Sequence, residues 1–203
     1  MKNTFLSLCV LFSLNAFSNT LEMANNLFSK RGEKVENSKE AASIFKALAD
    51  SETDSKKKAL RRLDQAKSLY YFGGKVASKE HKKKVYTEAY QSAGEAIKLM
   101  SSSKGVPAPG VEKNELALAH YQYSINLARW GQANGISASI SKLNELVENL
   151  NLTNELDETV ENFGAYRTLG RTKFKVPAAL ARLMGLGNFT TEDALDALFN
   201  AYD

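Results

Sequence analysis

The residues best suited to binding chemistry are aromatic side chains and arginines that stand next to glycine near expected helix ends. They occur in three stretches, 69-LYYFGG-74, 127-LARWGQANG-135 and 163-FGAYRTLG-170. Glycine lets neighbouring helices approach closely, and a large ring beside it fills the resulting groove. Each ring taken alone therefore fits core packing, whereas the set together predicts an apolar cavity lined by several helices.

The predicted site combines aromatic rings with cations. The rings expected to line the cavity are Tyr70, Tyr121, Trp130 and Tyr166, and the cations expected at its mouth are Arg129, Arg167 and Arg171. Arg167 and Arg171 are four residues apart and share one helix face, where two cations meet an acidic partner or flank a ligand carboxylate. The site is therefore predicted to bind a small apolar or carboxylated ligand, or an acidic partner.

Signals of catalysis are missing from the sequence. His81 and His120 are the two histidines, and neither stands in a metal-ligand spacing. We interpret His120 as a packed or surface residue rather than a general base. The chain has no nucleophile elbow and no glycine-rich phosphate loop after a strand. We expect no enzyme activity, no cofactor and no metal.

The charge balance does not indicate nucleic acid as a partner. The formal net charge is +4, and basic residues concentrate in 56-KKKALRR-62 and 81-HKKK-84. These runs fall on strongly helical segments, where lysine and arginine usually form a solvated face. We therefore expect a solvated surface there rather than a phosphate-binding patch.

The first 18 residues are typical of a cleaved secretory signal. A basic start, Met1 to Thr4, is followed by the apolar run 5-FLSLCVLFSL-14 and by the small residues Ala16 and Ser18. The run is too short to span a bilayer, and the small residues are placed as signal peptidase requires. The sequence thus predicts export to the periplasm and cleavage after Ser18.

Cysteine usage agrees with this interpretation. Cys9 is the single cysteine and lies inside the predicted signal, so the mature chain would have no disulfide. A lipid anchor at Cys9 is not expected, because Leu8 stands where a lipidation motif needs a small residue. Later apolar runs are too short for a membrane span, so a soluble mature protein is expected.

The elements that must position the site are all helical. Apolar residues recur at spacings of three and four, and strand alternation is absent. Breakers and caps give the boundaries. The expected helices cover about 20–30, 38–50, 55–74, 78–100, 113–134, 136–150, a segment ending at Pro177, a short stretch before 185, and 192–202. Between them we expect a linker over 101–110 and a polar connection at 151–154.

Helices in antiparallel pairs predict an all-α, irregular tetratricopeptide-like repeat solenoid. The pair 55–74 and 78–100 is the clearest, since a helix-turn-helix unit of roughly 34 residues has small residues where helices touch. We assign residues 19–203 to this single domain. The alternative is a compact bundle of unrelated helices.

Three stretches carry a resemblance to a known family: 24-ANNLFSKRGE-33, 121-YQYSINLARWGQANG-135 and 164-GAYRTLGRTKFKVP-177. Together they resemble the T component associated with tripartite ATP-independent periplasmic (TRAP) transporters, the TatT family. The resemblance implies a periplasmic tetratricopeptide-like fold, a hydrophobic pore, a trimeric assembly, and a periplasmic solute-binding protein as partner. The chain departs from that family in lacking a lipidation cysteine and in its short tail after Pro177.

The leading functional hypothesis is a non-enzymatic periplasmic helical-repeat protein. It would bind the solute-binding component of a TRAP-type transporter and hold or relay a small apolar or carboxylated ligand. The alternative is a structural envelope scaffold that binds only proteins. A hydrolase with a dispersed site is a third hypothesis, which predicts that a change at His120 or at a buried carboxylate abolishes turnover without unfolding the chain.

Overall fold

The computed structural model describes residues 20–187 and 189–201, and these confirm the predicted all-α class. A helical stretch over 20–29 precedes the labelled elements. The helices are α2 (Val35–Ser51), α3 (Ser55–Lys75), α4 (Lys79–Met100), α5 (Lys113–Asn134), α6 (Ile136–Ser141), α7 (Leu143–Asp157), α8 (Gly164–Lys175), α9 (Ala178–Leu183) and α10 (Thr191–Phe199). In this part of the chain, no helix has the length and apolar character needed to cross a membrane. The predicted signal, 1–18, lies outside the described residues.

Several helix starts are set by side chains that accept the unpaired amides of the first turn. Asp54 accepts a backbone N–H at the start of α3, and Ser78 does the same at the start of α4. Thr190 and Asp193 form a capping box before α10. The predicted starts of these three helices are therefore confirmed.

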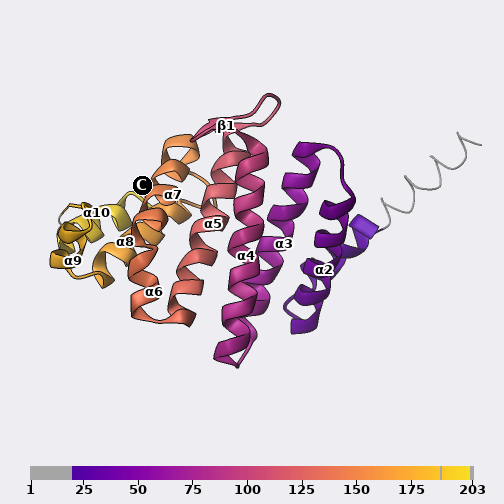
Figure 1. Ribbon diagram of the computed structural model, residues 1–203, viewed down its shortest axis with the longest axis horizontal. Helices are drawn as coiled ribbons and strands as arrows, with labels where there is room; N and C mark the ends of the chain where they lie inside the picture. The colour runs from indigo at the N-terminus through magenta and orange to yellow at the C-terminus, as the bar shows by residue number, and fades with distance from the viewer. Residues whose placement is uncertain (1–19, 188, 202–203) are drawn as a thin grey trace, which may run out of the picture.

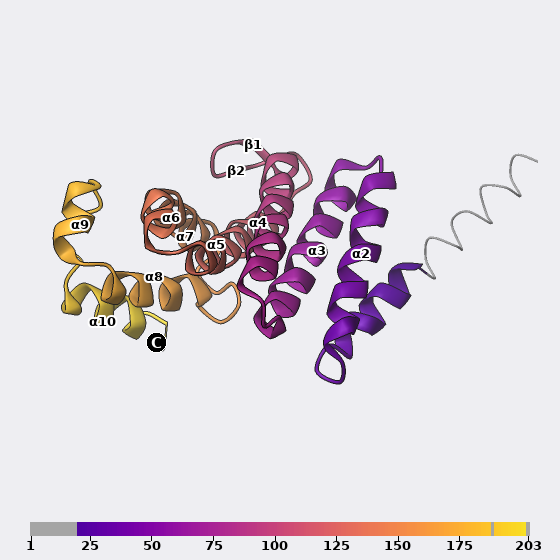
Figure 2. The ribbon, with the colours of Figure 1, turned by 60° about the horizontal axis from the view of Figure 1, so that its bottom comes forward.

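From α2 to α5, successive helices pack side by side, so order along the chain is there also order along the long axis of the molecule (Figure 1 and Figure 2). Contacts join α2 to α3, α3 to α4, α4 to α5, α5 to α7, α7 to α8, and α8 to α10. In addition, α3 contacts α5, and α5 contacts α8. The helices α3, α5 and α8 therefore follow one another in space, although other helices separate them in the chain.

Alanine contacts bring the helices close together. Between α3 and α4, Ala59, Ala66, Ala93 and Ala96 are fully buried, and Leu63 fills the space beside them. Small side chains at a helix contact let the backbones approach, and the larger rings are left to fill the edges. This packing explains why many aromatic side chains lie half-buried beside the core rather than inside it.

Two predicted boundaries are wrong. Helix α2 begins at Val35 rather than after Ser38, which is buried inside the helix. The polar segment 151–154 is not a connection, because it continues α7 to Asp157. Within it, Thr153 is buried and its hydroxyl donates to the backbone oxygen of Asn149, so the helix satisfies its own polar side chain. The break falls at 158–163 instead.

The predicted linker 101–110 folds into a small hairpin, which the sequence analysis did not anticipate. Strands β1 (Ser101–Ser103) and β2 (Val106–Pro107) pair antiparallel. Gly105 turns the chain with a positive φ of 70°, and a Cβ there would lie 2.9 Å from Leu152 of α7. Lys104 forms an ion pair with Glu148, also on α7. The hairpin is therefore attached to the helices rather than separating two domains.

Candidate functional site

Side chains from three helices gather on one face, which we call the α3/α5/α8 face. Helical spacing places two of them one turn apart on α3 and two others about two turns apart on α5. Their mutual contacts and charges connect the three helices. The face comprises Lys67 and Tyr70 of α3, Tyr121 and Arg129 of α5, and Arg167 of α8.

Arg129 and Tyr70 form the contact between α3 and α5. The guanidinium carbon of Arg129 lies 5.7 Å from the centroid of the Tyr70 ring. Interaction with the Tyr70 hydroxyl raises the pKa of Arg129, so this cation stays charged. Arg129 is exposed and also donates to Gln132 Oε1 at 3.2 Å. The pair thus presents a guanidinium to solvent on an aromatic support.

Tyr121 packs against the start of α8. A Cβ on Gly164 would lie 2.6 Å from Cζ and from the hydroxyl oxygen of Tyr121, so glycine is required for this approach. Burial raises the pKa of the Tyr121 hydroxyl, while the nearby Arg167 guanidinium opposes that shift. The glycine in this stretch therefore has the role predicted for it, which is to admit a neighbouring helix.

The turn before α8 has an unusual backbone. Glu161, Asn162 and Phe163 all have positive φ, at 50°, 54° and 57°. This left-handed region is unfavourable for residues other than glycine, and among those residues asparagine tolerates it best. Arg167 Nη2 donates to the Glu161 backbone oxygen at 2.7 Å, and Glu161 Oε1 lies 3.7 Å from Lys67 Nζ. The turn is therefore attached both to α8 and to α3.

The α3/α5/α8 face carries a positive charge. Lys67, Arg129 and Arg167 contribute three cations, and the carboxylate of Glu161 lies beside them. Asp64 also lies near Lys67, but it pairs with Arg61 at 2.9 Å. Burial raises the pKa of the Asp64 carboxyl, and both cations oppose that shift. Guanidinium and ammonium groups beside tyrosine rings suit a ligand that combines carboxylates with apolar groups.

The remaining predicted residues lie in other surroundings. Trp130 packs on Tyr90 of α4 with ring centroids 5.8 Å apart. Tyr166 donates to Glu158 at 3.2 Å and lines a separate open pocket of about 350 Å³ between α7, α8 and α10. Arg171 is exposed, one further turn along α8 from Arg167. The four predicted rings thus divide among three surroundings instead of lining one cavity.

Helical geometry explains this division. Gly164 turns toward α5, and a residue two positions later points to nearly the opposite side of the helix. Tyr166 therefore faces away from Tyr121, whereas Arg167 and Arg171, at three and seven positions, stay on the side of Gly164. The prediction of one shared cavity was therefore wrong for Tyr166, whose register on α8 turns it away from Tyr121.

Two residues of this region were missed. Lys67 stands three positions before Tyr70 on α3, so the register of that helix could have identified it. Glu161 approaches Lys67 through the left-handed turn and the packing of α8. Nothing in the local sequence indicates that contact.

His120 is buried, with 3% of its surface exposed, and its Nδ1 lies 2.7 Å from Asn149 Oδ1. Burial lowers the pKa of His120, which favours the neutral ring. Within residues 20–187 and 189–201, no group of three or more histidine, cysteine or acidic side chains is arranged to hold a metal ion. His120 therefore has the surroundings of a packed residue.

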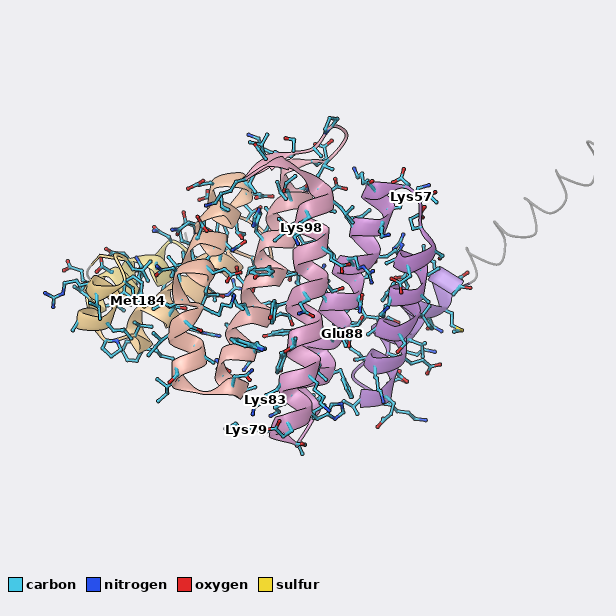
Figure 3. All side chains as sticks on the ribbon, in the orientation of Figure 1. Lys57, Lys79, Lys83, Glu88, Lys98 and Met184 are labelled. Carbon is cyan, nitrogen blue, oxygen red and sulfur yellow. The ribbon has the colours of Figure 1, made fainter. Side chains whose placement is uncertain are left out.

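The basic runs lie mainly on the surface. Figure 3 shows Lys79 and Lys83 at one end of α4 and Lys98 near the other end. Lys83 pairs locally with Glu80 at 2.6 Å. Arg62 is the exception, because it is buried between α2 and α4. The predicted solvated face therefore holds for the lysines and not for this arginine.

A comparison with protein-family models finds no match, and a search of curated proteins finds no similar sequence.

Proposed function

We propose that this chain is a non-enzymatic binding protein whose α3/α5/α8 face holds an acidic or carboxylate-bearing segment of a partner. The observation that carries the proposal is the convergence of Lys67, Arg129 and Arg167 with two tyrosines from three helices. Guanidinium groups bind carboxylates with directional hydrogen bonds, and tyrosine supplies apolar contact at low entropic cost.

The architecture in this proposal is an irregular tetratricopeptide-like solenoid. Successive helix contacts and the additional contacts of α3 with α5 and of α5 with α8 support it. In a stack of helix pairs, the first helices of successive pairs form one continuous surface. The α3/α5/α8 face would be that surface, and its composition decides what binds there.

The partner to test first is the solute-binding component of a TRAP-type transporter, in the periplasm. The predicted signal peptide supports the compartment, and the resemblance to the TatT family supports the partner. Two of the stretches that carry the resemblance, 121–135 and 164–177, contain Tyr121, Arg129 and Arg167. In this proposal the chain holds or relays a small apolar or carboxylated ligand together with that partner.

The second candidate function is a structural envelope scaffold that contacts proteins alone. The packing of Trp130 on Tyr90 favours it, because that ring stabilises the helix stack. Native mass spectrometry of residues 19–203 from the host periplasm separates the two functions. A retained small molecule supports ligand binding, and a chain that carries only proteins supports the scaffold.

Affinity capture with crosslinking tests the binding proposal. The wild-type chain is compared with Lys67→Gln/Arg129→Gln, and with Lys79→Gln/Lys84→Gln as a control of equal charge change on α4. We expect the wild type and the control to capture a solute-binding protein and the face variant to lose most of it. Equal capture by all three proteins contradicts the proposal.

A further inference from the structure

We infer that Glu161 occupies the α3/α5/α8 face from within the chain, and that an acidic peptide segment of the partner binds there by displacing it. This inference rests on the proposed function. It narrows the occupant to an acidic peptide segment and adds a built-in competitor that lowers the affinity of the face for acids.

Glu161 is held at the face by its side chain and its backbone. The carboxylate lies 3.7 Å from Lys67 Nζ, and the backbone oxygen accepts a hydrogen bond from Arg167 at 2.7 Å. Two of the three cations of the face are therefore already engaged by one residue of the same chain. The third, Arg129, is exposed over the Tyr70 ring.

The carboxylate of Glu161 is positioned to be displaced. Its side chain is 48% exposed, and that of Lys67 is 28% exposed. Ion pairs this accessible to water are weak, and their loss is compensated by hydration. An acidic segment with several carboxylates can contact Lys67, Arg129 and Arg167 together, which one residue cannot do.

The backbone of the turn that holds Glu161 beside Lys67 is strained, which is a reason to expect the turn to have a functional role. Three successive residues of the turn, Glu161, Asn162 and Phe163, have left-handed backbone conformations, which are unfavourable for residues other than glycine. Strain of this kind collects at ligand clamps and switch regions. The turn is held at its α8 end, where Gly164 lies against Tyr121, whereas the Glu161 side chain is held by its exposed ion pair with Lys67.

Two alternatives elsewhere in the molecule are weaker. The pocket beside Tyr166 contains both acids and a lysine, so it favours no one ligand charge. The exposed apolar side chains Phe174, Leu183 and Phe199 lie near the C-terminal helices, but nothing in the structure identifies what covers them. The Glu161 turn differs from both, because the contacts of Glu161 with Lys67 and Arg167 indicate that the ligand it competes with is acidic.

Fluorescence anisotropy with a labelled glutamate-rich decapeptide, and with its glutamine counterpart, tests the inference on the chain from residue 19 onward. The proteins are the wild type, Glu161→Gln, the control Glu158→Gln, which removes the same charge from the same turn, and Lys67→Gln/Arg129→Gln. Circular dichroism verifies that each variant is folded.

We expect Glu161→Gln to bind the acidic peptide about two- to fivefold more tightly than the wild type, because a surface ion pair is removed. Glu158→Gln should change the affinity far less, and the double lysine and arginine variant should bind more weakly. Equal gains in Glu161→Gln and Glu158→Gln overturn the competitor and leave the proposed function intact. Absence of acidic-peptide binding in every protein overturns both.

Discussion

The helices α2 to α4 and the helices α8 to α10 are stabilised in different ways. In the first region, Arg62 joins neighbouring helices, with Nη2 2.6 Å from Asp50 of α2 and Nε 2.6 Å from Glu95 of α4. The Nε–H is not directed at the Glu95 oxygen, so that contact is ionic rather than a hydrogen bond. Gln65 completes the network by accepting from Ser92 at 2.7 Å.

The second region has no comparable network. Among its described residues, 164–187 and 189–201, no ion pair joins two side chains. Its helices are shorter, and α8 meets α10 through Gly170, close to Leu198 and to the backbone oxygen of Ala194. Phe174 and Leu183 are 71% and 84% exposed. Polar contacts between helices are therefore concentrated in α2 to α4, whereas α8 to α10 are joined mainly by apolar packing.

The α3/α5/α8 face connects these two regions. Lys67 and Tyr70 belong to the well-fixed helix α3, whereas Glu161 and Arg167 belong to the less connected end. A ligand that contacts both sides would hold α8 against α3. Binding at the face is therefore expected to stabilise the C-terminal helices more than the N-terminal ones.

Removal of Arg62 should have the largest effect on stability. Arg62 Nη1 donates to the buried Gln65 Oε1 at 3.1 Å, so Arg62→Ala removes one partner of Gln65 and also breaks the contacts to α2 and α4. We expect a loss of about 2–3 kcal/mol in the free energy of unfolding, measured by urea denaturation. The control is Lys83→Ala, which breaks an exposed local pair with Glu80 on α4 and should cost far less. Equal losses would show that the network does not stabilise α2 to α4.

Gly170→Ala should cause the second largest loss in the free energy of unfolding. A Cβ there would lie 2.7 Å from Leu198 Cγ and 2.9 Å from the Ala194 backbone oxygen, so α10 must move. We expect a loss of about 2 kcal/mol and faster proteolysis of α10. Gly74→Ala is the control, because nothing lies within 4 Å of its Cβ, and it should be neutral or slightly stabilising. Slow, unchanged proteolysis of Gly170→Ala would contradict the described α8 and α10 contact.

Position 161 should prefer glycine to alanine. Both Glu161→Gly and Glu161→Ala lose the contact to Lys67, but alanine keeps the disfavoured left-handed φ. We expect the glycine variant to be more stable by about 1 kcal/mol in thermal denaturation. At ordinary surface positions glycine is the less stable choice, so a more stable alanine variant would show that the turn is not strained.

His120 should give the smallest effect, visible as a dependence on pH. Burial lowers its pKa, an effect that the contact with Asn149 opposes and Lys104 reinforces. The unfolded chain therefore binds a proton at a higher pH than the folded chain, and stability falls as pH decreases through the unfolded value. We expect the wild type to lose up to about 0.7 kcal/mol more than His120→Gln between pH 7 and pH 6. Parallel pH profiles would contradict this role.

Local sequence signals predicted the helices well where caps and breakers are unambiguous. Asp54, Ser78 and Thr190 each begin a helix because a short polar side chain accepts an amide of the first turn. The segment 151–154 was misassigned, because it continues α7, and its buried Thr153 bonds to a carbonyl of that same helix. A sequence pattern does not distinguish a solvated polar residue from one satisfied in this way.

Only part of the candidate site could be predicted from the sequence, because local patterns do not show which helix faces meet. Tyr70, Tyr121, Arg129 and Arg167 meet because α3, α5 and α8 follow one another in space, as stacked pairs would require. Trp130 and Tyr166 point elsewhere because of their registers on α5 and α8. The contact of Glu161 with Lys67 depends on the packing of segments that are distant in the sequence, so no local spacing predicts it.

Site-specific photo-crosslinking in the host periplasm tests the central claim most directly. A photoreactive phenylalanine analogue replaces Tyr70 on the α3/α5/α8 face, and in a second protein it replaces Lys98, which lies on α4 outside that face (Figure 3). We expect a solute-binding protein to crosslink at position 70 and not at position 98. Equal crosslinking at both positions, or crosslinking at position 98 alone, would contradict the assignment of this face as the binding surface.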